Sequence, residues 1–174
     1  MLQISPQSLD GRHVRAMARH DLAMVVGMMT RLAQHHGDAG LPSGPVDVAG
    51  LEADLFGPVP LLHGLVAERF GFVVGYALML PRYRAQISPP VLPRVLDVEQ
   101  LYVHEGSRGR GLGRMLMEGI MAFAQQDGFT VLAAGQLSET ARGQAFFERI
   151  GFAPGGDVGL VTALEPFAED VAAA

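Results

Sequence analysis

The chain has 174 residues, of which 49% are apolar, and it carries a formal net charge of −5. That length and apolar content predict a single domain over residues 1–174 that buries roughly two-thirds of its unfolded surface. The sequence contains no cysteine, which excludes disulfides, thiolate metal sites and a cysteine nucleophile. The acidic balance argues against nucleic-acid binding, which requires basic stripes for phosphates, and mildly favours a cationic substrate.

No targeting or membrane signal is evident in the sequence. The N-terminus lacks a basic flank followed by an apolar core, and apolar runs such as residues 72–80 are far too short to span a bilayer. We therefore expect a cytoplasmic protein that has no membrane partner.

The first part of the chain predicts a strand, two helices and a loop. The strand covers residues 14–17, and Asp21 can cap the helix that follows it. Gly37 is expected to end that helix. Residues 40–46 contain two prolines and predict a loop, and residues 48–56 predict a second, short helix. The apolar positions of the first helix follow helical spacing and are Leu22, Val25, Val26, Met29, Leu32 and Ala33.

Strands then dominate the pattern. Apolar runs predict a hairpin of strands over 62–69 and 72–83, and a central strand over 95–103 after a Pro-rich loop at 89–93. A mixed α/β fold follows from this order of elements, with a largely antiparallel central sheet flanked by helices. The remaining predicted elements are a helix over 112–126 followed by Gly128, a strand over 130–134, a helix that begins at Ser138 or Thr140 and is closed by Gly151, and a strand over 158–164.

The most informative motif joins the central strand to helix 112–126. Its residues are Arg108, Gly109, Arg110, Gly111, Leu112 and Gly113. Glycines let backbone N–H groups approach an anion because no Cβ intervenes. The helix N-terminus adds unpaired N–H groups and the positive end of the helix dipole. Together with the cationic side chains of Arg108, Arg110 and Arg114, this pattern predicts a pyrophosphate site.

Two familiar nucleotide loops do not fit this motif. In G-x-G-x-x-G, counting from Gly109 puts Arg114 at the third glycine, and counting from Gly111 puts Leu116 there. A nucleoside-triphosphate loop needs Gly-Lys-Ser/Thr, whereas Gly113 is followed by arginine. What remains is R-x-x-G-x-G after a strand that ends in Leu-Tyr-Val. This pattern resembles the acetyl-coenzyme A (acetyl-CoA) signature of the GCN5-related N-acetyltransferases (GNAT).

The resemblance extends over most of the chain. Residues 63–78 are similar to the second and third strands of that family, and residues 146–152 are similar to its late helix and the Gly-Phe that ends it. Within the family, residues 99–103 and the short segment after Phe152 look most like the diamine (spermidine/spermine) acetyltransferase branch. The resemblance implies acetyl-CoA as the acyl donor and no metal. Dimerisation is common in the family, so a homodimer is an open alternative.

The resemblance also implies roles for the central strand. An amine attacks a thioester only as its free base. An alkylammonium with a pKa of about 10.4 needs roughly 4–5 kcal/mol to lose its proton at neutral pH. Glu99 would supply the base, and Asp97, on the same nominal strand face, could assist in binding an ammonium. The N–H of Leu101 would donate to the thioester carbonyl, and the backbone of Val103 would pair with the pantetheine beside a bulge. The simpler alternative is that both carboxylates only decorate a strand that reaches solvent.

Two positions depart from the family pattern. The tyrosine that often protonates the departing thiolate is Phe147 here, and the asparagine often found seven residues earlier is Thr140. Because Phe147 cannot donate a proton, the thiolate would leave unaided, be protonated by water, or recruit another residue such as Tyr83 or Tyr102.

Taken together, the resemblance implies an N-acetyltransferase that moves an acetyl group directly from acetyl-CoA to a primary amine in a ternary complex. A non-catalytic acyl-CoA sensor or partner-binding module on the same fold is the alternative. An anion-binding helix with unrelated chemistry is a third. A polyamine, an aminoglycoside-like compound, an amino acid and a protein N-terminus are all open as acceptors, because the loops at 40–46 and 83–93 would form the acceptor pocket.

Overall fold

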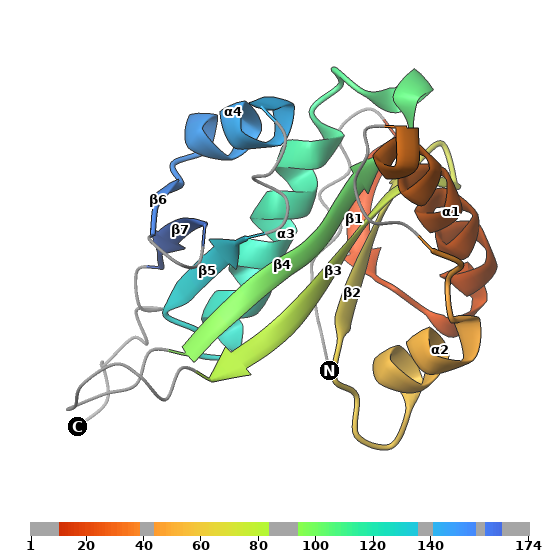
Figure 1. The fold of residues 1–174 in the computed structure, drawn as a ribbon, viewed down its shortest axis with the longest axis horizontal. Coiled ribbons are helices and arrows are strands. Elements are labelled where there is room, and N and C mark those ends of the chain that lie inside the picture. The colour runs from red at the N-terminus through yellow and green to blue at the C-terminus, as the bar shows by residue number, and fades with distance from the viewer. Residues whose placement is uncertain (1–10, 39–43, 84–93, 136–140, 156–158, 165–174) are drawn as a thin grey trace.

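One seven-stranded sheet organises the chain. The computed structural model describes residues 11–38, 44–83, 94–135, 141–155 and 159–164. In this part of the chain the strands follow the order β1-β2-β3-β4-β5-β7-β6 (Figure 1). All neighbours are antiparallel except β4 and β5, which are parallel. The mixed, largely antiparallel sheet with flanking helices predicted from the sequence is confirmed.

The elements have the following bounds. The strands are β1 (Arg12–Ala16), β2 (His63–Arg69), β3 (Phe72–Tyr83), β4 (Arg94–Val103), β5 (Val131–Ala134), β6 (Ala153–Pro154) and β7 (Leu160–Ala163). The helices are α1 (Leu22–Asp38), α2 (Val48–Phe56), α3 (Leu112–Gln126) and α4 (Ala141–Arg149), with short 3-10 turns η1 (Arg19–Asp21) and η2 (Glu105–Ser107). None of the helices in these ranges is long and apolar enough to cross a membrane.

Helices cover both faces of the sheet, and strand alternation divides the apolar side chains between two cores. On one face, α1 and α2 pack against the sheet, and on the other α3 and α4 do (Figure 1). The α1/α2 core contains Leu22, Val25, Met28, Leu51, Leu55, Val66, Tyr76, Leu78 and Tyr102. The α3/α4 core contains Leu65, Ala67, Ala77, Met79, Leu96, Val98, Leu112, Leu116, Ile120, Phe123 and Phe147.

The predicted elements differ from the observed ones mainly at strand ends. The first strand runs from Arg12 to Ala16 rather than over 14–17, because its polar residues pair with Arg69 and Glu68 across the sheet. β6, which has two exposed residues, carries no sequence signal. Gly37 lies inside α1, which continues to Asp38. The predicted features at 40–43, 89–93, Ser138, Thr140 and residue 158 lie outside the described residues.

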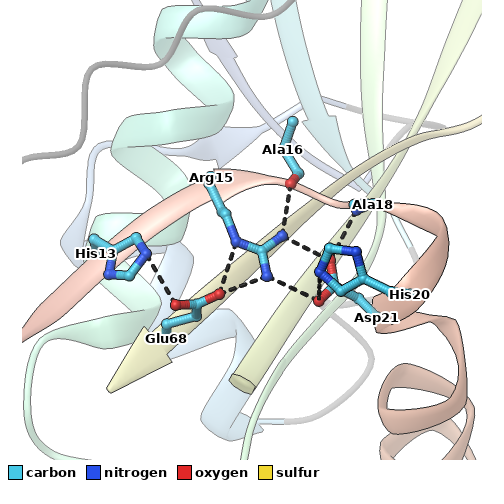
Figure 2. Close-up of polar contacts among 7 residues, drawn as sticks. All are labelled: His13, Arg15, Ala16, Ala18, His20, Asp21 and Glu68. Atoms are coloured by element: carbon cyan, nitrogen blue, oxygen red, sulfur yellow. Dashed lines mark hydrogen bonds and ion pairs between the residues drawn. The ribbon is translucent and has the colours of Figure 1, made fainter. Parts of the chain in front are cut away.

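Asp21, through Arg15, links the segment before α1 with β1 and β2 (Figure 2). Its carboxylate accepts hydrogen bonds from Arg15 Nη1 and Nη2, at 2.7 and 2.8 Å, and from the N–H of Ala18 at 2.8 Å. Arg15 Nε also donates to Glu68 at 2.7 Å, and His13 Nε2 lies 2.9 Å from the same carboxylate. Burial alone would raise the pKa of Asp21, but the hydrogen bonds from Arg15 and Ala18 outweigh it and hold this pKa below its ordinary value. The sequence predicts Asp21 as the cap of the first helix. In the structure Asp21 lies directly before α1, and its carboxylate bonds to Arg15 of β1 and to the Ala18 N–H.

We expect Asp21→Asn to lower the free energy of unfolding by about 2–3 kcal/mol at pH 7. This is less than the about 3–5 kcal/mol for a fully buried pair, because 29% of the Arg15 side chain is exposed. Since the folded state lowers the pKa of Asp21, its contribution is complete above the unfolded pKa of about 3.9 and is lost as pH falls through the folded value. Urea unfolding from pH 7 to pH 2.5 should therefore show a shallower acid loss in the variant.

Glu52→Gln is the matched control. Glu52 pairs with Arg19 on the surface, where the two side chains are 41% and 61% exposed, and such pairs contribute about 0–1 kcal/mol. Equal losses in the two variants would contradict the structural role of Asp21.

Candidate functional site

β4 loses its partner on one side halfway along its length. It pairs with β5 only from Val95 to Asp97, opposite Val131–Ala133, but continues to Val103. β3 accompanies it along its whole length. In the described ranges, the second half of β4 is therefore an open edge inside the sheet. Such an edge can pair with an extended ligand.

A β-bulge lies where the two strands separate. Leu78 faces Gln100 and Met79 faces Val98, so Glu99 is the extra residue. The bulge switches the alternation: Leu96 and Val98 enter the α3/α4 core before it, and Leu101 packs against that core after it. Gln100 faces the other side, where it accepts a hydrogen bond from the buried Tyr76 hydroxyl at 2.8 Å. The bulge that the family resemblance implied is confirmed.

The ladder also determines where the backbone groups of the open edge point. His104 N–H donates to the Val74 carbonyl at 2.8 Å, which makes this a hydrogen-bonded pair. Such pairs alternate with non-bonded ones, and the register runs evenly from Gly75–Val103 to Leu78–Gln100. The backbone groups of Leu101 and Val103 therefore point away from β3, toward the side that β5 has left.

The loop after β4 adopts the conformation that its glycines predict. Gly109 and Gly111 have φ values of +73° and +80°, a left-handed region that other residues rarely adopt. Gly111 is the N-cap of α3, and its carbonyl accepts the N–H of Met115 at 3.0 Å. The N–H groups of residues 112–114 precede that bond and are available for an anion.

The three loop arginines have different surroundings. Arg108 turns back onto β4, where its Nε donates to the Val103 carbonyl at 2.8 Å and its guanidinium lies 5.6 Å from the Tyr102 ring centre. Arg114 is exposed and pairs with Glu118 at 2.9 Å. The carbonyl of Arg110 accepts a hydrogen bond from Arg12 Nη1. The sequence alone does not predict the contact of Arg12 with this loop, because β1 and the loop are distant in the chain.

Glu99 and Asp97 share one cation on the α1/α2 face. Arg82 Nε lies 2.9 Å from Asp97 Oδ2, and its Nη2 lies 2.5 Å from Glu99 Oε1. The hydrogen bond to Glu99 raises the pKa of Arg82, against the opposing effect of burial, with further attraction from both carboxylates. Both carboxylates thus contact the same guanidinium. The sequence alone does not predict the contacts of Arg82 either, because only the β3–β4 register brings Arg82 to these carboxylates. No cluster of three metal-ligating residues occurs among the residues that the structure describes.

Phe147, which replaces the usual tyrosine, and Tyr102, a candidate proton donor, are buried in different cores. Phe147 is 2% exposed, and its ring centre lies 5.2 Å from that of Phe146 and 5.1 Å from that of Phe152. Tyr102 is 6% exposed and stacks on Tyr76 on the opposite face of the sheet. The side chain of Tyr83, and Thr140, lie outside the described residues.

Comparisons with known proteins agree with this geometry. The model of the acetyltransferase (GNAT) family matches residues 31–152. N-alpha-acetyltransferase 80 of Mus musculus is 35% identical over an alignment of 112 residues, and the match covers 51% of this chain and 36% of the mouse protein. The yncA protein of Salmonella typhimurium, solved with its cofactor acetyl-CoA, has a TM-score of 0.65 and 22% identity over 94% of this chain and 99% of its own. AAC(6')-Iy, solved with the bisubstrate analogue CoA-S-monomethyl-acetylneamine, has a TM-score of 0.65 and 19% identity over 82% and 90%.

The chain belongs to the GNAT acetyltransferase family, whose model covers most of it. The match to the mouse protein spans little more than a third of that relative, and the solved structures share the fold at low sequence identity.

We expect Gly111→Ala to weaken coenzyme A binding by about tenfold or more. A left-handed alanine costs roughly 1–2 kcal/mol, and the loop relieves this strain by leaving the conformation that presents its N–H groups. Isothermal titration calorimetry with coenzyme A measures the change.

Gly128→Ala is the control, because Gly128 also has a left-handed φ, at +72°, but lies at the opposite end of α3 from the loop. Its dissociation constant should stay within about threefold of the parent, since the strain arises far from the loop. Equal dissociation constants for the parent and Gly111→Ala would show that coenzyme A binds elsewhere.

Proposed function

We propose that the chain transfers the acetyl group of acetyl-CoA directly to a primary amine, with the donor along the open edge of β4. The observation that carries this proposal is the continuity of that edge with the glycine loop. The backbone of Leu101 and Val103 points into the gap left by β5, and the strand leads directly into the loop at the start of α3. The diphosphate would bind the loop through residues Arg108, Gly109, Arg110, Gly111, Leu112, Gly113 and Arg114.

In this proposal the backbone acts on the thioester and Glu99 acts on the amine. The Leu101 N–H donates to the acyl oxygen as negative charge develops there, a contribution of about 2.7–4 kcal/mol for a well-placed donor. The amine nitrogen bonds to the acyl carbon, the carbon–sulfur bond breaks, and its electron pair leaves with sulfur as thiolate. The proton of the amine passes to the Glu99 carboxylate. Val103 aligns the pantetheine by strand-like pairing.

The leaving group in this mechanism needs no protein acid. Phe147 is buried between Phe146 and Phe152 and carries no proton to give. The thiol of coenzyme A, with a pKa of about 8.5 by analogy with cysteine, leaves readily as thiolate at neutral pH. The thiolate therefore departs unaided and is protonated by water.

Arg82 defines how an acceptor would reach Glu99. Its guanidinium occupies the position facing both carboxylates, and it is 47% exposed. An incoming ammonium can replace the Glu99 contact while Asp97 retains Arg82, because the two carboxylates use different guanidinium nitrogens. The Glu99 carboxylate, once it has exchanged Arg82 for the ammonium, then favours a cationic acceptor.

Three acceptor classes have support. The resemblance of residues 99–103 to diamine acetyltransferases favours a polyamine, the mouse relative's name points to a protein amino terminus, and the bisubstrate analogue bound to AAC(6')-Iy points to an aminoglycoside. All three are primary amines that are cationic at neutral pH.

An acceptor panel with acetyl-CoA tests the proposal by thiol release. We expect turnover with at least one of spermidine, neamine, a free amino acid and a peptide with a free amino terminus. The same peptide with an acetylated amino terminus is the matched control and should be inert. Thiol release that never depends on an added amine would contradict direct transfer.

Glu99→Gln should reduce kcat by about a hundredfold at pH 7, within the range for a general base. The loss should shrink toward pH 9.5, because more of the amine, with a pKa of about 10.4, is then already deprotonated. The measurement is a pH–rate profile with the best acceptor.

Glu148→Gln is the control, since this residue is exposed on α4 and its carboxylate accepts a hydrogen bond from Gln144. It should match the parent at every pH. A parallel, pH-independent loss in Glu99→Gln would assign Glu99 to acceptor binding instead of proton transfer.

A further inference from the structure

Arg12 connects the edge strand β1 with the loop before α3. Its Nη1 donates a hydrogen bond to the carbonyl of Arg110, which is 98 residues away in the sequence. The sheet register explains the contact: Arg12 faces Arg69 on β2, which faces Phe72 on β3. Gly75, three residues further along β3, faces Val103. The start of β1 and the end of β4 therefore lie at the same end of the sheet.

This hydrogen bond determines the orientation of one peptide unit in the loop. The carbonyl of Arg110 and the N–H of Gly111 belong to the same planar trans peptide and point in opposite directions. Fixing the oxygen toward Arg12 therefore aims the Gly111 N–H away from β1. A Cβ on Gly111 would lie 3.5 Å from Arg12 Nη1, so the guanidinium also covers the loop on that side.

A second guanidinium holds the other end of the same segment. Arg108 Nε donates to the Val103 carbonyl at 2.8 Å. Between these two contacts, the N–H groups of Ser107 and Arg108 bond to the carbonyls of His104 and Glu105 at 2.8 and 3.1 Å. Contacts within the protein thus hold the loop from Val103 to Gly111.

We propose that Arg12 is a positioning residue for the diphosphate of the acyl donor: it holds the Arg110–Gly111 peptide in the orientation that presents its N–H to the anion. This inference rests on the proposed site at residues 108–114. Because the loop is ordered in advance, less conformational entropy is lost when the donor binds. Without Arg12, the loop would have to be ordered when the donor binds, and the entropy lost in ordering it would weaken binding.

The test compares Arg12→Met with Arg69→Met. Methionine keeps an unbranched apolar side chain but has no donor, and Arg69 is the strand neighbour whose guanidinium lies over the Phe70 ring. We expect Arg12→Met to raise the dissociation constant of coenzyme A about tenfold in calorimetry, and Arg69→Met to change it less than twofold. With acetyl-pantetheine, which lacks the diphosphate, kcat/KM should be unchanged in both.

Salt separates positioning from simple charge attraction. Charge attraction is largely screened at 1 M salt, where the Debye length is about 3 Å, whereas a misoriented peptide is not corrected. The tenfold effect of Arg12→Met should therefore persist at 1 M salt. Its disappearance, or an equal loss with acetyl-pantetheine, would overturn the proposal.

A third measurement requires no ligand. Limited trypsin digestion should cleave after Arg110 at least fivefold faster in Arg12→Met than in the parent or in Arg69→Met, because the loop is released. Unchanged cleavage would overturn the proposal. A parent that fails to bind coenzyme A would instead contradict the proposed function, and the digestion would still decide whether Arg12 holds the loop.

Discussion

The separation of β4 from β5 after Asp97 is the constraint on which the site depends. A strand in the middle of a sheet normally satisfies its backbone groups on both sides, and β4 has this arrangement only over Val95–Asp97. Beyond that point, in the described part of the chain, β4 pairs only with β3, and the backbone groups of Leu101 and Val103 point away from β3. The bulge at Glu99 lies just after the point of separation, and the loop after β4, which contains η2, leads to α3.

The bulge also determines which side chains of β4 lie on each face of the sheet. Because Glu99 is the extra residue, Leu101 packs against the α3/α4 core while Glu99 and Asp97 meet Arg82 on the α1/α2 face. The loop carries helix N–H groups and arginines, whereas two carboxylates, Asp97 and Glu99, lie beside Arg82. An anionic donor and a cationic acceptor would thus approach the same strand from regions of opposite charge.

Features that depend on residues close together in the chain could be predicted from the sequence. The bounds of α2, β3 and α3 match their predictions residue for residue, because Asp47 caps α2 by accepting the Gly50 N–H and because apolar spacing defines α3. The glycine loop could be found because left-handed φ values require glycine. Partners that depend on register could not be found. Arg82 meets Glu99, and Arg12 meets Arg110, only once antiparallel pairing brings together strands that are distant in the chain. The two-residue β6 is too short to show a pattern.

The central claim is that acetyl-CoA lies along the open edge of β4 with its diphosphate on the loop. Backbone ¹⁵N NMR during a coenzyme A titration tests it most directly, because each amide reports its own hydrogen bond. We predict that the largest shifts occur at Leu101, Val103, Gly111, Leu112 and Gly113, while amides of β1 and α2 change little. Unchanged amides at these five positions, with shifts concentrated on the α1/α2 face, would contradict the account.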